Sequence, residues 1–221
     1  MVKILGEAEV IAVPAWVVDI ESFRRWTDSA DCPHEYRLGW LKGEVWIDMS
    51  KEQVFTHVLV KTKMGMRLAL LAEEEKLGLY LGDGLLLSNF AADISGNPDG
   101  TFLSYETLRS DRVRLIEGKG GGFTEIQGSP DMVLEVVSAS SVQKDYELLR
   151  QAYWEAGIRE YWLVDARTEP PKFAILRHTP RGYVTARKQA GWIKSAVFGK
   201  AFRLTQTTSD LGHPKFTLEI R

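Results

Sequence analysis

The stretch 129–165 changes its hydrophobic period twice. A short apolar run follows Pro130 and has the length of a strand buried on both faces. Apolar residues then recur at the spacing of a single helix face, at Val142, Tyr146, Leu149, Tyr153 and Ala156. A second apolar run follows at 161–164. The pattern therefore predicts a strand, a helix and a second strand.

The ends of this helix carry their own signals. Ser140 or Ser141 can cap its start, and Gly157 ends it. The connection between the strands is short, so we predict a right-handed crossover that joins parallel strands at 131–137 and 160–165. The helix, at 141–156, is predicted to pack across one face of the sheet.

Similar patterns predict elements on both sides of this unit. Asp19 can cap a short helix that ends before Pro33, and two alternating runs around Lys42-Gly43 indicate a hairpin. A long amphipathic helix is predicted at 53–77. Its proposed apolar stripe consists of Val54, Val58, Thr62, Met66, Leu70 and Leu77.

The remaining pattern consists mainly of short strands. They are predicted near 79–81, 85–87 and 101–104, in a hairpin that turns at 179–182, around Phe202 and at 216–220. The segment 105–127 is charged and is predicted to be mainly loop. The fold class is therefore α/β, with a mixed β-sheet flanked by helices and with additional hairpins.

Neither a repeat nor a linker divides the 221 residues. We expect a single domain over 1–221, with a core at about 15–190 and a basic β extension at about 171–221. A hydrophobic content of 44% is sufficient for a sizeable core.

The charge is unevenly distributed along the chain. Residues 171–221 contain ten basic and two acidic side chains, a net charge of +8, which leaves −10 for residues 1–170. Between Pro171 and Ser209 there are eight Lys or Arg and no Asp or Glu. Such a segment either binds a polyanion or folds back on the acidic remainder of the chain, and the sequence favours neither.

The expected location is the cytoplasm. Cys32 is the single cysteine, which excludes a disulfide framework and a thiolate zinc site. The first ten residues lack the apolar core of a signal peptide, and the sequence contains no 18-residue apolar run for a membrane span.

Four acidic residues are candidates for chemistry: Glu44, Asp99, Asp131 and Glu135. Carboxylates that converge from neighbouring strands are suitable ligands for Mg²⁺ or Mn²⁺. Asp131 and Glu135 share a strand face, but about 13 Å separates residues four apart at about 3.3 Å each. The second carboxylate should therefore come from an adjacent strand, and Asp99 is the best placed.

Each candidate also has an ordinary explanation. Asp99 lies in Asn-Pro-Asp-Gly, a type I turn sequence, Asp131 suits a strand-start turn, and Glu44 follows a hairpin glycine. Glu135 is the exception, because it lies in the middle of a buried strand. There it must be protonated, paired with Lys or Arg, hydrogen-bonded or bound to a metal.

Several motifs together resemble a known family. They are LKGEV at 41–45, His57, NPDG at 97–100, SPDMVLEVVSASS at 129–141 and AGIREYWLVD at 156–165. Over residues 15–190 the chain resembles the Uma-two family, described as putative restriction endonucleases, whose core is PD-(D/E)XK nuclease-like. The resemblance implies a restriction-endonuclease-like fold and a Mg²⁺- or Mn²⁺-dependent hydrolase acting on DNA phosphodiester bonds.

Carried over residue by residue, the resemblance makes Asp99 and Glu135 metal ligands and Glu44 the acid from an early element. The lysine of the E-x-K element should stand at 137, where this chain has Val137. Lys144, in the first turn of the following helix, is the nearest replacement, with Arg150 behind it. A nuclease needs such a cation beside the metal to stabilise developing negative charge.

Three functions remain open at this point. The first is an endonuclease that cuts DNA, where two cuts in a duplex would suit a homodimer. The second is a nuclease fold that has lost catalysis and binds nucleic acid or protein through its basic segment. The third is a metal-dependent hydrolase of another phosphate ester.

Overall fold

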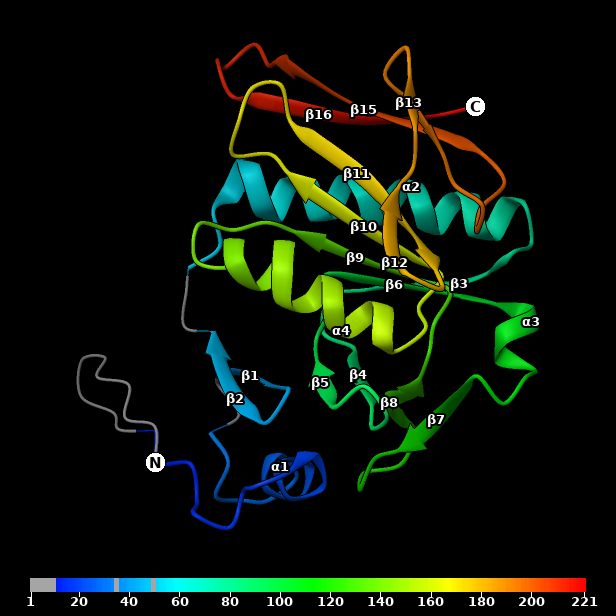
Figure 1. The fold of residues 1–221 in the computed structure, drawn as a ribbon. Helices are drawn as coiled ribbons and strands as arrows, with labels where there is room; N and C mark the ends of the chain where they lie inside the picture. Colours follow the sequence, from blue (N-terminus) through cyan, green and yellow to red (C-terminus); the bar gives the residue numbers. More distant parts are fainter. Residues whose placement is uncertain (1–10, 34–35, 49–50) are drawn as a thin grey trace.

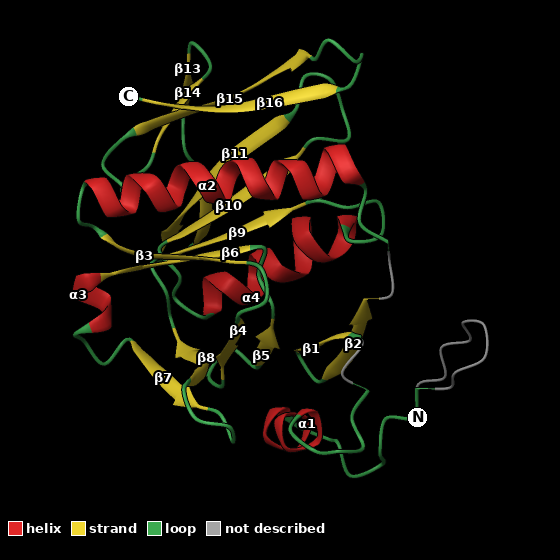
Figure 2. Ribbon diagram, turned by 180° about the vertical axis from the view of Figure 1, so that it is seen from behind, coloured by secondary structure: helices red, strands yellow, loops and turns green. Residues whose placement is uncertain are grey.

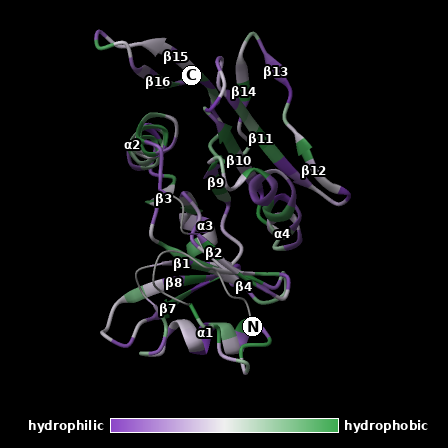
Figure 3. Ribbon diagram, turned by 90° about the vertical axis from the view of Figure 1, so that its left-hand side faces the viewer, coloured by the Kyte–Doolittle hydropathy of each residue, from purple (hydrophilic) through white to green (hydrophobic). Residues whose placement is uncertain are grey.

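A computed structural model describes residues 11–33, 36–48 and 51–221. These residues form two six-stranded sheets and one four-stranded sheet. In Figure 1 the three sheets follow one another from bottom to top, with α1 below the lowest and the C-terminal strands above. Helices α2 and α4 lie on opposite sides of the central strands (Figure 3).

The central sheet has the strand order β12-β11-β10-β9-β6-β3. Its strands are β3 (Gly78–Gly82), β6 (Gly100–Ser104), β9 (Met132–Val136), β10 (Glu160–Asp165), β11 (Lys172–Thr179) and β12 (Gly182–Thr185). β9 and β10 pair in parallel, and the other neighbours are antiparallel. The predicted mixed sheet and its parallel central pair are confirmed.

The crossover helix between β9 and β10 is also confirmed, with one local difference. A π-helical turn, η2 (Lys144–Leu148), precedes α4 (Leu149–Glu155). Leu149, Ala152 and Tyr153 pack against one face of the sheet. Gly157 has a φ of +70°, which glycine adopts without the strain that a Cβ brings, and it ends the helix as predicted.

The opposite face of the central sheet is covered by the long helix, which consists of η1 (Val54–Val58) and α2 (Leu59–Glu74). The helix is confirmed, but the predicted apolar stripe is wrong. Val54 is 63% exposed and Met66 is 53% exposed, whereas Val60, Met64 and Leu68 are fully buried. Both sets have a spacing of four residues, so the sequence pattern does not distinguish the two faces.

The second six-stranded sheet has the order β2-β1-β5-β4-β8-β7. Its strands are β1 (Arg37–Leu41), β2 (Glu44–Asp48), β4 (Leu86–Asn89), β5 (Ile94–Gly96), β7 (Val113–Glu117) and β8 (Phe123–Gly128). β1 and β2 form the predicted hairpin, and α1 (Ile20–Thr27) is capped by Asp19. The loop predicted at 105–127 is wrong, because α3 (Tyr105–Leu108) and the β7–β8 hairpin occupy it.

The third sheet consists of β13 (Lys188–Gln189), β14 (Trp192–Lys194), β15 (Ala201–Thr208) and β16 (Pro214–Ile220). It packs beside α2 (Figure 2), and Phe202 of β15 contacts Trp162 of β10 with ring centroids 4.7 Å apart. Phe202, Phe216 and Leu218 join the apolar cluster beneath α2. No helix in the described ranges has both the length and the apolarity to cross a membrane.

Candidate active site

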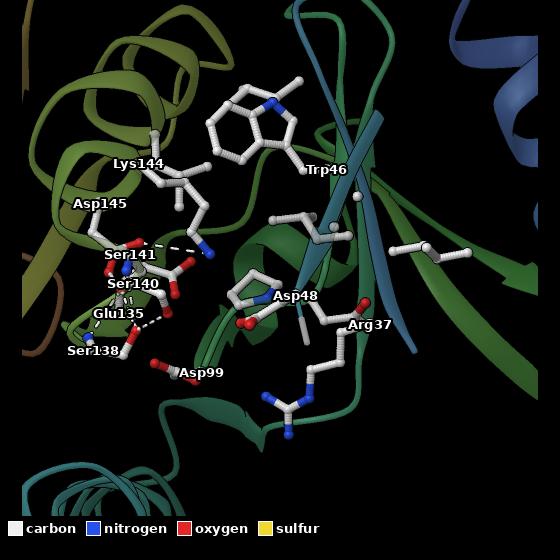
Figure 4. A pocket seen from close by; sticks show the side chains of 18 of the residues that line it. Arg37, Trp46, Asp48, Asp99, Glu135, Ser138, Ser140, Ser141, Lys144 and Asp145 are labelled. Atoms are coloured by element: carbon white, nitrogen blue, oxygen red, sulfur yellow. Dashed lines mark hydrogen bonds and ion pairs between the residues drawn. The ribbon is translucent and has the colours of Figure 1, made fainter. Parts of the chain in front are cut away.

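A cavity of about 540 Å³ opens between the β1–β2 hairpin and the end of β9. Its wall comes from β1, β2, η1, the β5–β6 connection, β9 and the start of the helix after β9. In Figure 4 acidic side chains and Lys144 gather on one side of it, opposite Trp46. Three of the four predicted site residues, Asp99, Glu135 and Lys144, line this cavity.

Asp99 lies just before β6 and is 9% exposed. Its Oδ2 accepts a hydrogen bond of 2.7 Å from the N–H of Val136. His57 Nε2 lies 3.7 Å from Oδ2 and Lys61 Nζ lies 3.5 Å from Oδ1. Burial raises the pKa of Asp99, although Lys61 and the Val136 N–H act in the opposite direction.

Glu135 lies in β9 directly beside Asp99. Gly100 of β6 pairs with Leu134 of β9, so the next residues on the two strands are Asp99 and Glu135. Burial raises the pKa of Glu135 well above its usual range, and the charges of Asp99 and Asp145 raise it further. Tyr153 donates a hydrogen bond of 2.6 Å to Oε1. Glu135 is therefore held in place by a neutral donor while its nearest acidic neighbours repel it.

Lys144 projects from η2 toward these carboxylates (Figure 4). Burial alone would lower the pKa of Lys144, but Glu135, Asp145 and other carboxylates outweigh burial and raise it. Lys144 Nζ lies 3.7 Å from Oδ1 of Asp145. The lysine is thus held in its charged form close to the acidic cluster.

Asp145 is a member of the cluster that the sequence analysis missed. It is 1% exposed, lines the cavity and accepts a hydrogen bond from the Ser141 hydroxyl. Burial raises its pKa to about 6. A first-turn Asp is so common in helices that its position alone did not indicate a site. The π-helical turn is the distinguishing feature, and the sequence pattern did not show it.

The structure does not bring Glu44 to the cavity. Glu44 is exposed at the hairpin turn and is absent from the cavity wall. Asp48, four residues along β2, lines the cavity instead. Those four residues span about 13 Å of strand, which explains the different positions of the two acids.

Asp131 is also outside the cavity. It is fully buried at the start of β9, where it pairs with Arg159 at 2.8 Å and accepts a hydrogen bond of 2.7 Å from the N–H of Ser104. The ordinary explanation, a structural aspartate at the beginning of a strand, fits this residue.

A network of ion pairs borders the acidic cluster near Asp99. Lys61 Nζ lies 2.6 Å from Glu52 and 2.8 Å from Asp83, and Arg37 pairs with the same two carboxylates at 2.8 and 2.9 Å. These charges come from four separate parts of the chain. Because Lys61 and Arg37 are already paired with Glu52 and Asp83, they offset little of the charge of Glu135 and Asp145.

The carboxylates around the cavity fit a hard divalent cation. Mg²⁺ prefers oxygen ligands, and one or two carboxylates suffice when waters and substrate phosphates complete its shell. Asp99 and Glu135 supply two, and Oδ1 of Asp145 is buried without a hydrogen-bond partner. Within the described ranges, no three His, Cys, Asp or Glu side chains form a complete metal cluster, so such an ion would depend on substrate or water for further ligands.

A family model with the description "Putative restriction endonuclease", named Uma2, matches residues 20–207. The chain belongs to the Uma2 family. Four chains of solved structures also match. One, from Anabaena variabilis, is titled a putative nuclease of the DUF820 group. Its sequence is 12% identical to that of this chain, and the two structures match with a TM-score of 0.60. The match covers 82% of this chain and 91% of the Anabaena chain. A search of the curated proteins found no match.

These comparisons confirm the Uma2 family resemblance and the restriction-endonuclease-like fold. The departure at Val137 is now explained in structural terms. Val137 is fully buried in the apolar cluster that includes Leu149 and Tyr153, so a lysine there would need space and a partner in the core. Lys144, seven residues further along the chain, lies beside Asp145 instead.

Proposed function

We propose that the protein is a metal-dependent endonuclease that hydrolyses phosphodiester bonds in DNA. The observation that carries the proposal is the convergence of Asp99, Glu135, Asp145 and Lys144 on one cavity, in a member of the Uma2 family. Burial, and then repulsion by Asp99 and Asp145, raises the pKa of Glu135, and a bound cation would relieve that repulsion. Perturbed groups gathered in a cavity are typical of functional sites.

Asp99 and Glu135 would hold the ion, Mg²⁺ or Mn²⁺, and water and a substrate phosphate would complete its shell. Asp145 is a further buried carboxylate in the same cavity. Such an ion, when bound, polarises the phosphate and lowers the pKa of water. Tyr153 fixes the orientation of Glu135 through its hydrogen bond. The Val136 N–H does the same for Asp99, so both ligands are positioned by the fold.

Lys144 would supply the positive charge that phosphodiester cleavage requires beside the metal. Its ammonium group is positively charged, buried in large part and surrounded by carboxylates that keep it protonated. A fixed charge in such a site stabilises the negative charge that develops on the phosphate during cleavage, without reorganisation at the moment of reaction. Lys144 thus replaces the lysine expected at position 137.

Addition of Mn²⁺ is expected to raise the melting temperature and to permit nicking of supercoiled plasmid. An ion that binds only the folded state stabilises it by about 2.7 kcal/mol at a concentration 100 times its Kd. The Asp99→Asn variant is expected to lose both effects. Calorimetry measures the melting temperature, and gel electrophoresis measures nicking of the plasmid. Hydrolysis of a small phosphate ester is measured in parallel as the alternative activity.

An Asp99→Asn protein with an unchanged Mn²⁺ shift would remove Asp99 from the ion site. Hydrolysis of the small ester without nicking would favour the third function, a hydrolase of other phosphate esters. Glu44→Gln serves as the matched control, because Glu44 is exposed and outside the cavity.

A binding module on the same fold is the second candidate, and the exposed basic residues of segment 171–209 favour it. Arg203 pairs with Glu219 at 2.6 Å and Lys200 pairs with Glu75 at 2.7 Å. Arg187 and Lys188 are exposed, and within the described ranges no ion pair involves them. The segment therefore folds back on the rest of the chain in part and leaves other charges available.

If these free charges hold nucleic acid, DNA affinity is expected to fall steeply with salt, because each neutralised phosphate releases counterions. Reversing Arg187 and Lys188 to Glu should then flatten the plot of log K against log salt. Fluorescence anisotropy over a salt series measures the slope. A slope that the double variant does not change would assign the segment to intramolecular contacts alone. None of its residues lines the cavity, so cleavage chemistry is tested separately.

A further inference from the structure

The cavity has an apolar wall opposite its acidic cluster. This wall belongs to the second sheet and includes Leu41, Trp46, Leu87 and Ile94. Metal ligation and phosphate binding do not need such a surface. Ligand sites that combine an apolar wall with a few convergent polar groups usually bind an organic group next to the polar one.

Trp46 is the aromatic side chain of this wall. In Figure 4 Trp46 projects from β2 and Lys144 from the helix on the other side of the cavity. The cross-strand partner of Trp46 in β1 is Gly39, which has no side chain to cover the ring as a larger partner would. The indole Nε1 is buried and has no hydrogen-bond partner. No hydrogen bond through this donor therefore fixes the ring within the wall.

The burial of the carboxylates limits how a nucleic acid can reach them. Asp99, Glu135 and Asp145 are each at most 9% exposed. A cavity of about 540 Å³ has the volume for a small ligand, in the range of about 300–1,000 Å³ for such sites, and not for a stacked duplex. A nucleotide that has left the base stack can place its phosphate at these residues and its base against the apolar wall of the same cavity.

We propose that the cavity accepts one unpaired nucleotide, with its base stacked on Trp46 and its phosphate toward Asp99, Glu135 and Lys144. The inference rests on the proposed nuclease function and names its substrate: nucleic acid with an unpaired base at the cut. Aromatic rings stack on every base, so recognition at Trp46 is tolerant of sequence. The unpaired base comes either from a single strand or from a nucleotide rotated out of a duplex.

Three labelled DNAs distinguish these two sources: a single strand, a full duplex and a duplex with a central mismatched bubble. Cleavage in Mn²⁺ is expected to be at least about tenfold faster for the single strand and the bubble than for the duplex, because unpairing is already complete. A duplex cut equally fast, but in a manner that depends on Trp46, identifies rotation out of the stack and also supports the inference. Equal cleavage without dependence on Trp46 overturns it.

Substitutions at Trp46 supply the second measurement, binding of a phosphorothioate-linked single strand that resists cleavage. Trp46→Leu keeps an apolar side chain without a ring and is expected to weaken binding by about 5- to 150-fold, the range for one stacked base. Trp46→Phe retains a ring and should stay within about threefold of wild type. Trp16→Ala is the control, since Trp16 is 49% exposed and outside the cavity wall.

Melting temperatures of all variants identify any loss of folding. The comparison of Trp46→Leu with Trp46→Phe remains valid because both variants lack the indole.

Two results separate the proposed nuclease function from the proposed nucleotide site. Binding that depends on Trp46, with none of the DNAs cut, leaves the nucleotide site in place and rejects the nuclease. Cleavage that depends neither on pairing nor on Trp46 leaves the nuclease in place and rejects the nucleotide site.

Discussion

Replacement of Glu135 with glutamine is expected to reduce plasmid cleavage by at least about 10²- to 10³-fold, the loss typical when one electrostatic contact to the transition state is removed. The same change should leave the metal-free protein as stable as wild type or more stable. Burial and the charges of Asp99 and Asp145 raise the pKa of Glu135, so its ionised form destabilises the folded state. Glutamine removes that charge and retains an oxygen that can accept the Tyr153 hydrogen bond.

The direction of the pH dependence follows from the raised pKa of Glu135. The folded state holds this proton more tightly than the unfolded chain does, so stability is greatest below the unfolded pKa and falls as the pH rises toward the folded pKa. The melting temperature of Glu135→Gln relative to wild type should therefore increase over the same pH range. Melts without metal at a series of pH values test this expectation.

Glu125→Gln is the matched control for Glu135→Gln. Glu125 is 3% exposed and accepts hydrogen bonds from Arg24 and Ser88, so its loss of charge should destabilise the protein. If Glu135 instead existed to balance Lys144, its replacement would cost about 3–5 kcal/mol and lower the melting temperature by several degrees. Early melting of Glu135→Gln, or nicking at the wild-type rate, would contradict the ligand role.

Replacement of Glu160 with alanine is expected to lower stability by about 3–5 kcal/mol, because several buried donors would lose their acceptor. Oε2 accepts hydrogen bonds from Trp162 Nε1 at 2.9 Å and from Ser195 Oγ at 2.6 Å. Oε1 accepts one of 2.6 Å from the N–H of Ala196. Glu160 thus connects the central sheet to the segment that leads from β14 into β15.

The predicted change in melting temperature is a decrease of about 10 °C, from about 2–4 °C per kcal/mol for a chain of this size. Glu160→Gln retains one acceptor and should lose less. Glu155→Ala, at an exposed ion pair with Lys42, is the control and should melt as wild type does.

We propose one domain over 1–221, so a single unfolding transition is expected in these melts. Separate melting of the third sheet would contradict the proposal of one domain.

Local patterns were sufficient to predict most of the elements. The 129–165 unit has apolar runs of strand length, a helical period and a terminating Gly157, and the structure has β9, a helix and β10 in those places. The β7–β8 hairpin was missed because its strands are charged and surround a glycine-rich turn, with Leu115 and Phe123 exposed. A hairpin with few buried apolar residues, here Val113 and Ile126, leaves a weak hydrophobic period.

The candidate site shows the same difference between local and distant information. Asp99 and Glu135 were predicted from a proline-aspartate turn and from a charge inside a buried strand, both visible in short stretches of sequence. The choice of Asp48 over Glu44 at the cavity depends on how the β1–β2 hairpin meets the rest of the protein. The inward position of Asp145 depends on a π-helical turn, for which the sequence has no simple periodic signal.

The sequence by itself determined the parallel β9–β10 unit, the flanking helices, the family and two carboxylates, because hydrophobic period and turn residues act over a few neighbours. Only the tertiary structure decided which face of the long helix is buried, since the exposed pair Val54 and Val58 has the same four-residue spacing as the buried pair Val60 and Met64. It also decided that Trp46 and Lys144, from distant segments, line the same cavity. Contacts between distant segments depend on how sheets and helices pack, and no local pattern contains that information.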